Sequence, residues 1–108
     1  MSRPLLDTPD VYRALSDPTR RGVLDMLTHR DHNVSEMASK FAMSLPAFSR
    51  HLRVLRQAGL VAERSDGRRR VYHLNPAPLR DVSEWLAAYK RFWKGRLRQL
   101  DQHLKEKP

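Results

Sequence analysis

Arginine and serine side chains are concentrated in one stretch of this 108-residue chain, between Ser44 and Arg70. Guanidinium groups form paired hydrogen bonds to phosphate oxygens and to the edge of guanine, and serine hydroxyls can hydrogen-bond to either. These side chains therefore indicate contacts to a polyanion rather than covalent catalysis. They fall into two groups, an earlier one of Ser49, Arg50, Arg53 and Arg56 and a later one of Arg64, Arg68, Arg69 and Arg70.

A capped helix is predicted to carry the earlier group. Ser44 is a preferred N-cap residue, Pro46 lies in the first turn, where its missing N–H costs nothing, and Gly59 provides a left-handed stop. Apolar residues between these limits recur at spacings of four and three, which places them on one face of the helix. That face consists of Phe48, Leu52 and Leu55, and it leaves the serine and the arginines on the other sides.

A β-hairpin is predicted to carry the later group. The segments 60–65 and 68–74 are rich in β-forming residues and flank Asp66-Gly67, a dipeptide typical of a two-residue hairpin turn. The hairpin would form a wing beside the capped helix. Arginines at the tip of such a wing suit phosphates or the minor groove.

A shorter helix is predicted just before the capped one, over VSEMASKFA, with Ser35 as its N-cap. Residues 42–44 then form the connection, which has the length that joins the two helices of a helix-turn-helix motif. The motif spans residues 34–59. The second helix of such a motif inserts its N-terminal turns into the major groove, where serine and arginine side chains meet base edges.

Two further helices are predicted ahead of this motif. The first runs from about Asp10 to Leu15, and the second has Asp17 as its N-cap and Pro18 at its first position. The second helix is expected to end near residues 28–30. Its expected buried residues are Val23, Leu24 and Leu27.

One long amphipathic helix is predicted over residues 79–104, after the break at residues 75–78. Trp85 and Phe92 widen its apolar face beyond what a small domain needs to cover one core. A partner helix is therefore expected, and residues 79–104 are predicted to be a dimerisation helix. The predicted dimer interface consists of Leu86, Tyr89, Trp93, Leu97 and Leu100.

The composition limits the class of protein. The length predicts a single domain over residues 1–108. Lysine and arginine total 21 against 12 acidic residues, and the net charge of +9 favours nucleic acid or an anionic membrane surface as partner. No apolar run approaches the roughly 18 residues of a membrane span and no leader sequence is apparent, so we expect a cytoplasmic protein that does not insert into a membrane.

Neither an enzyme active site nor a cofactor is predicted. The sequence has no glycine-rich phosphate loop and no nucleophile elbow, and the lack of cysteine removes thiolate ligands and nucleophiles. His51 is expected to lie half-buried against a neighbouring helix, and His73 lies on the second strand of the wing. The possible zinc ligands of the last helix have poor spacing, so no metal site is expected; they are Asp81, Glu84, Asp101 and His103.

The chain resembles the ArsR family of bacterial winged-helix repressors over about residues 9–104. The resemblance is carried by DPTRR, by the hairpin and above all by SLPAFSRHLRVLRQAGL, which matches the family pattern S-x-x-x-(V/F)-S-x-H-L-x-x-L-x-x-A-G-L. The matching positions are Ser44, Phe48, Ser49, His51, Leu52, Leu55, Ala58, Gly59 and Leu60.

This resemblance implies a homodimer, formed by the first and last helices, that binds an inverted repeat in double-stranded DNA. Each half-site would receive one recognition helix and one wing. Family members that sense arsenic or soft metals usually carry a Cys-x-Cys motif in the helix that here contains VSEMA, and this chain departs from them. By position, the base-reading residues of the family fall on Leu45, Pro46, Ser49 and Arg50.

The sequence thus predicts a mostly α winged helix-turn-helix fold, with about five helices and a two-stranded wing. The favoured function is a dimeric, sequence-specific DNA-binding repressor without metal response. The alternatives are a metal-responsive repressor with non-cysteine ligands, a winged-helix module that binds an acidic protein, and a helix that lies on a membrane surface. The predicted DNA contacts are Ser44, Leu45, Pro46, Ser49, Arg50, Arg53, Arg64, Arg68, Arg69 and Arg70.

Overall fold

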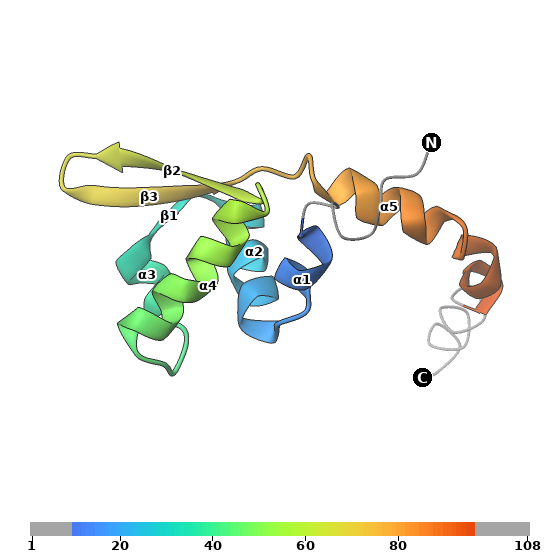
Figure 1. The fold of residues 1–108 in the computed structure, drawn as a ribbon, viewed down its shortest axis with the longest axis horizontal. Helices are drawn as coiled ribbons and strands as arrows, with labels where there is room; N and C mark the ends of the chain where they lie inside the picture. Colours follow the sequence, from blue (N-terminus) through green and yellow to red (C-terminus); the bar gives the residue numbers. More distant parts are fainter. Residues whose placement is uncertain (1–9, 97–108) are drawn as a thin grey trace, which may run out of the picture.

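The structure is a computed structural model that describes residues 10–96. Helices α1 to α4 form one body, the hairpin of β2 and β3 projects from one end of it, and α5 leads away from the other end (Figure 1). This arrangement confirms the predicted winged helix-turn-helix fold, which is mostly helical with a β-hairpin wing.

The first two helices begin where the sequence predicts. Asp10 precedes α1 (Val11–Leu15) and accepts a hydrogen bond from the Arg13 N–H at 3.2 Å, and Asp17 caps α2 (Pro18–His29) in the same way through the Arg20 N–H at 3.1 Å. Each carboxylate satisfies a backbone donor that has no partner inside its helix. The predicted core residues of α2 are all buried: Val23, Leu24 and Leu27.

The N-cap of α3 (Val34–Ala38) is Asn33, so the predicted cap at Ser35 is wrong. The Asn33 side chain accepts from the Glu36 N–H at 2.9 Å, and a Glu36 carboxylate oxygen accepts from the Asn33 N–H at 3.2 Å. This reciprocal pair needs an acidic or amide residue three positions after the cap. Asn33 has Glu36 there, whereas Ser35 has Ala38.

The connection to the next helix runs over residues 39–44, so α3 ends earlier than predicted and the turn is longer than residues 42–44. Phe41 explains the difference, because its ring lies outside the helix and stacks on Phe48 with centroids 5.5 Å apart. A Cβ atom at Gly22 would lie only 3.0 Å from the Phe41 ring. The ring therefore packs closely over α2, and a helix continued through Phe41 is replaced by this tertiary contact.

Helix α4 (Leu45–Gln57) has the predicted limits. The Ser44 hydroxyl accepts from the Ala47 N–H at 3.3 Å, and Gly59 has a φ of 76°, in the left-handed region that favours glycine. Burial of a large apolar side chain contributes about 1.5–3 kcal/mol, so the apolar face fixes which side of α4 stays outside. That face consists of Phe48, Leu52 and Leu55, each at most 3% exposed.

The wing comprises β2 (Val61–Asp66) and β3 (Arg69–Leu74). Asp66 pairs with Arg69, so the loop is Gly67-Arg68, one residue later than the predicted Asp66-Gly67 turn. Gly67 has a φ of 64° and Arg68 does not have a positive φ, which is typical of a type II′ turn with glycine at its first central position. Asp66 therefore stays in the strand ladder.

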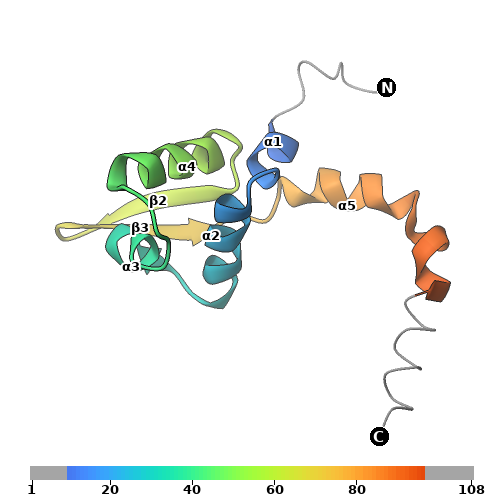
Figure 2. The ribbon, with the colours of Figure 1, turned by 90° about the horizontal axis from the view of Figure 1, so that it is seen from below.

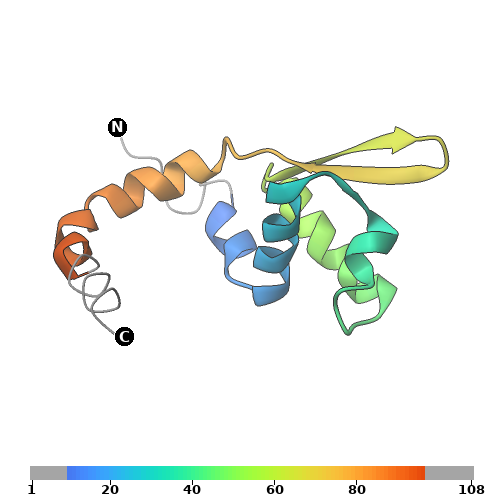
Figure 3. The ribbon, with the colours of Figure 1, turned by 180° about the vertical axis from the view of Figure 1, so that it is seen from behind.

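The sheet has three strands in the order β1-β3-β2, where two were predicted. Strand β1 (His32–Asn33) lies just before α3 and pairs with β3 through His32↔Tyr72 and Asn33↔Val71. Without β1, β3 would be an edge strand with unpaired backbone groups; pairing with the short β1 makes β3 the central strand. Figure 3 shows the segment between α2 and α3 passing beside the base of the wing.

Helix α5 (Leu79–Ala87) ends at a turn over residues 88–89, and helical structure resumes over 90–96. The continuous helix predicted for this stretch is therefore wrong, and Figure 2 shows the chain bending after α5. The backbone has 3₁₀-type hydrogen bonds here, between residues three apart in the chain. They run from the Tyr89 N–H to the Leu86 C=O and from the Phe92 N–H to the Tyr89 C=O, both at 2.9 Å. Two predicted interface residues lie outside the described residues: Leu97 and Leu100.

Candidate nucleic-acid interface

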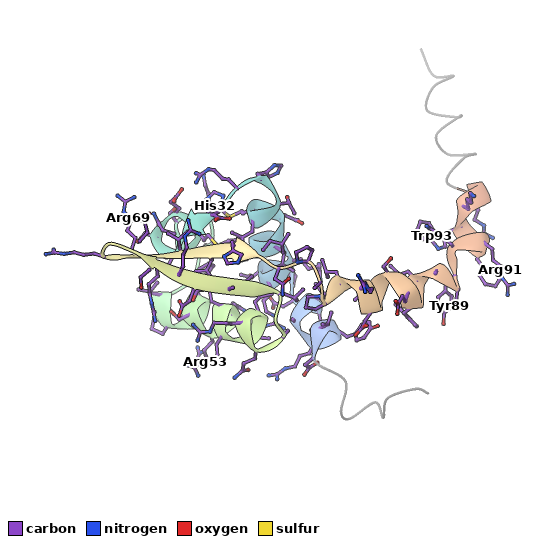
Figure 4. All side chains as sticks on the ribbon, turned by 90° about the horizontal axis from the view of Figure 1, so that it is seen from above. His32, Arg53, Arg69, Tyr89, Arg91 and Trp93 are labelled. Atoms are coloured by element: carbon purple, nitrogen blue, oxygen red, sulfur yellow. The ribbon has the colours of Figure 1, made fainter. Side chains whose placement is uncertain are left out.

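The exposed face of α4 carries the predicted recognition residues. Leu45 is 59% exposed, and Pro46, Ser49, Arg50 and Arg53 are exposed as well. Figure 4 shows Arg53 pointing away from the ribbon, so its charged end lies in solvent. The Ser44 hydroxyl lies at the same end of the helix, and although it accepts the capping bond, its own O–H remains a donor.

The wing arginines lie on exposed positions of the hairpin. Arg68, Arg69 and Arg70 line a hollow of about 380 Å³ together with residues 33–35, at the start of α3. In Figure 4, Arg69 extends outward from the wing. On the neighbouring strand β2, the Arg64 guanidinium lies 2.9 Å from a carboxylate oxygen of Asp31, which offsets its charge.

Recognition helix and wing are joined by a polar cluster that the sequence analysis missed. On α4, the Arg56 guanidinium lies 3.0 Å from one Glu63 oxygen and 3.4 Å from the Tyr72 hydroxyl. Arg70 lies 3.6 Å from the other Glu63 oxygen, which is inaccessible to solvent and has no hydrogen-bond partner in the described chain. Burial raises the pKa of the Tyr72 hydroxyl, and the neighbouring Glu63 carboxylate raises it further. Part of this cluster could have been found from the pairing of the two hairpin strands, because Glu63 and Tyr72 are direct cross-strand partners.

His51 is half-buried, as predicted, and contacts α2. Its Nδ1 lies 3.0 Å from an Arg20 guanidinium nitrogen and 3.7 Å from a carboxylate oxygen of Asp17. Because arginine can only donate, Nδ1 acts as the acceptor in the Arg20 contact. The Arg20 contact holds the middle of α4 against the start of α2, so His51 has a structural role.

A further ionic group lies beside β1. The Glu36 carboxylate lies 2.7 Å from an Arg30 guanidinium nitrogen and 3.3 Å from Nδ1 of His32. The hydrogen bond from Arg30, together with the backbone bond at Asn33, lowers the pKa of Glu36 to about 2. No group of three histidine, cysteine or acidic side chains in residues 10–96 is arranged to hold a metal ion. Asp101 and His103 lie outside the described residues.

Aromatic side chains are exposed on α1, on α5 and on residues 88–96 that follow α5, and we call this surface the aromatic face. The Tyr12 ring meets Trp85 edge to face at a centroid distance of 6.0 Å, and its hydroxyl donates to the Asp81 carbonyl at 3.3 Å. These contacts seat α1 against α5. The large exposed members of this face are Tyr12, Trp85, Leu86, Tyr89, Phe92 and Trp93, between 39% and 62% exposed.

Comparison with known proteins agrees with this architecture. A family model described as a helix-turn-helix domain matches residues 15–64. The chain is 38% identical over 77 residues to the transcriptional repressor SdpR of Bacillus subtilis, a match that covers 71% of this chain and 86% of that protein. It is 42% identical over 87 residues to the HTH-type transcriptional regulator Rv2034 of Mycobacterium tuberculosis, covering 80% of this chain and 78% of that protein.

Solved structures show the same fold. A crystal structure of an ArsR family transcriptional regulator superposes with a TM-score of 0.69 at 36% sequence identity, covering 82% of this chain and 96% of that one. The fold and the exposed cationic helix thus define a winged helix-turn-helix regulator that binds DNA and is not an enzyme. The chain belongs to the ArsR family of transcriptional regulators. No helix among residues 10–96 is long and apolar enough to cross a membrane.

Proposed function

We propose that this protein is a repressor that binds an inverted-repeat operator as a homodimer, with α4 of each subunit in the major groove. The observation that carries the proposal is the exposed face at the start of α4, with the arginine-rich wing beside it. A helix fits the major groove, which is about 12 Å wide, and arginine and serine there meet base edges. The role as a repressor is supported by the likeness to a transcriptional repressor.

Within this interface we assign two kinds of contact. Leu45, Pro46, Ser49 and Arg50 lie in the first turns of α4 and read bases. The remaining residues bind phosphates, which hold the protein on the duplex without selecting sequence. They are Ser44, Arg53, Arg64, Arg68, Arg69 and Arg70.

The aromatic face is the proposed dimer interface. Exposed aromatic side chains on α1, on α5 and on residues 88–96 supply the apolar contact area that stable interfaces need, and Leu86, Tyr89 and Trp93 lie within it. Tyr89 and Trp93 lie far from the wing (Figure 4), so a second subunit bound there leaves both DNA-contacting elements free. The two-fold symmetry of such a dimer matches an inverted repeat.

We also propose that metal ions do not control DNA binding and that the protein acts in the cytoplasm, where bacterial DNA lies. Soft metal ions prefer thiolate ligands, and this chain has no cysteine. Operator affinity measured with and without arsenite, cadmium or zinc is expected to be the same. A change well beyond tenfold that a chelator reverses would contradict this part of the proposal.

Selection of duplexes from a random pool by the full-length protein tests the proposed function. We expect an inverted repeat whose half-sites lie about one helical turn apart, roughly 10 base pairs. Failure to enrich any sequence would refute sequence-specific binding. An enriched site without two-fold symmetry would refute the dimeric arrangement.

Arginine variants then separate the two kinds of contact. Arg50→Ala is expected to cost about 1–3 kcal/mol on the selected site and to relax the preference at one base pair. Arg68→Ala is expected to weaken binding to the selected site and to random DNA equally. It should also reduce the slope of log affinity against log salt concentration by about one unit. If Arg50→Ala weakened binding to all sequences equally and Arg68→Ala changed the preferred sequence, Arg50 would be the phosphate contact and Arg68 the base contact.

A further inference from the structure

A second, smaller hollow lies between α4 and β3, and it brings Arg53 and Arg70, which are assigned above to phosphates, together with Arg56. Its volume is about 220 Å³, which is room for several water molecules or one phosphate group. Three elements meet around it, because Val34 begins α3 while the other residues belong to α4 and β3. Its lining consists of Val34, Ser49, Leu52, Arg53, Arg56, Arg70 and Tyr72.

The charge of this hollow is strongly positive. Arg53, Arg56 and Arg70 contribute three guanidinium groups, and Glu63 is the carboxylate that contacts two of them. The balance leaves two positive charges around a polar space that also contains the Ser49 and Tyr72 side chains. Like charges this close repel one another unless an anion lies between them.

Unused hydrogen-bond donors are available at the hollow. Arg56 meets Glu63 and Tyr72 through a single terminal nitrogen, and Arg70 approaches Glu63 through Nε. A guanidinium has five N–H donors, so both groups retain donors after these contacts. Glu63 therefore holds the two arginines from one side, and their free donors remain for a ligand.

The position of the hollow indicates the source of the ligand. If α4 occupies the major groove and the wing reaches the adjacent minor groove, the DNA strand that separates these two grooves passes between α4 and β3. The groups of that strand nearest the protein are its phosphates, and paired arginine donors fit phosphate oxygens. We propose that this hollow binds one backbone phosphate per half-site, held by the guanidinium groups of Arg53, Arg56 and Arg70. The assignment rests on the proposed function.

Neutralising single phosphates in the DNA tests the assignment. A duplex selected by the full-length protein is prepared with one methylphosphonate at a time, which removes the charge of that phosphate. Wild-type protein is compared with Arg56→Gln, with Arg70→Gln and with Arg13→Gln. The last variant removes the same charge on α1, where the Arg13 side chain is 65% exposed and away from the hollow.

We expect one phosphate position to be coupled energetically to Arg56 and Arg70. For the wild type and Arg13→Gln, one neutral phosphate per half-site weakens binding about tenfold or more, as the loss of charge-assisted hydrogen bonds implies. For Arg56→Gln and Arg70→Gln, the methylphosphonate at that position weakens binding less than about threefold. Methylphosphonates at other positions weaken the binding of these variants as much as that of the wild type. Arg70→Gln leaves the contact between Arg56 and Glu63 in place, so it carries the test if Arg56→Gln proves unstable in thermal unfolding.

Three other outcomes are distinguishable. If each methylphosphonate weakens the binding of Arg70→Gln as much as that of the wild type, the inference is wrong, although the protein still binds DNA. If inorganic phosphate binds the DNA-free protein in an Arg70-dependent way and no DNA position is coupled, the hollow serves free phosphate and the backbone assignment fails. If no duplex is retained from the pool at all, the proposed function itself fails.

Discussion

Replacing Arg20 with alanine tests how α1 and α4 are held together. The Arg20 Nε donates to the Ala14 carbonyl at 2.9 Å, and one terminal nitrogen donates to the Arg13 carbonyl at 2.9 Å. The other terminal nitrogen lies 3.0 Å from Nδ1 of His51 on α4. One side chain on α2 thus satisfies two carbonyls at the end of α1 and contacts the recognition helix.

The expected loss follows from the number of bonds. Each hydrogen bond contributes about 0.5–1.5 kcal/mol net, so the loss of three, of which two are partly buried, should lower the free energy of unfolding by about 2–3 kcal/mol. The neighbouring Arg21 is a matched control, because it donates one exposed bond, to the Leu15 carbonyl at 2.7 Å. Arg21→Ala should cost only about 0.5–1 kcal/mol.

Urea unfolding at one fixed protein concentration measures both variants, since the stability of an oligomer depends on concentration. Arg20→Ala should shift the midpoint down by about 1 M or more, given slopes of about 1–3 kcal/mol per molar for small proteins. Arg20→Lys should recover little of the loss, because an ammonium group cannot reproduce the planar fork of donors. Equal losses for the Arg20 and Arg21 alanine variants, or full recovery by lysine, would refute this reasoning.

Further predictions concern acid stability, a helix end and the aromatic face. Because the Arg30 hydrogen bond lowers the pKa of Glu36 from 4.5 to about 2, its stabilisation is complete above about pH 4.5 and is lost as the pH falls towards 2. Glu36→Gln should therefore flatten this part of an acid titration followed by circular dichroism; an unchanged curve would contradict the assignment. Gly59→Ala should destabilise the protein by about 1–2 kcal/mol, because Gly59 has a positive φ. Gly95→Ala should instead stabilise it by about 0.5–1 kcal/mol, because nothing lies within 4 Å of the added Cβ. Thermal unfolding measures both variants, and effects of the same sign would be inconsistent with these conformations. Tyr89→Glu should weaken dimerisation in sedimentation equilibrium and DNA binding in gel shifts together, and a variant that stays dimeric at micromolar concentration would argue against the aromatic face as the interface.

Helix limits that depend on neighbouring residues were predictable from the sequence. Asp17, Ser44 and Gly59 each act through backbone groups within a few residues, so their types alone mark where a helix begins or ends. The apolar face of α4 was predictable for a similar reason, because Phe48 and Leu52 lie one turn apart. The exposed recognition face follows from it as the remaining surface of the helix.

Features that depend on distant residues were not predictable in this way. The end of α3 is set by Phe41, which packs on α2 and α4 rather than continuing the helix. The bend after α5 leaves the apolar spacing of the sequence unchanged, so the periodicity could not signal it. The cluster around Glu63 requires both the hairpin register and the angle between wing and α4, and only its cross-strand pair with Tyr72 follows from the register.

The contacts that stabilise the fold also fix the distance between the aromatic face and the recognition helix. Tyr12 ties α1 to α5, Arg20 ties the end of α1 to α4 through His51, and Arg56 ties α4 to the wing through Glu63. Each link is a side-chain hydrogen bond between different elements, so together they position α1, α4, α5 and the wing relative to one another. In a symmetric dimer formed at the aromatic face, that distance sets the separation of the two recognition helices, and therefore the half-site spacing that the protein can bind. In the proposed dimer, operator spacing therefore depends on these links between elements as well as on the residues that contact DNA.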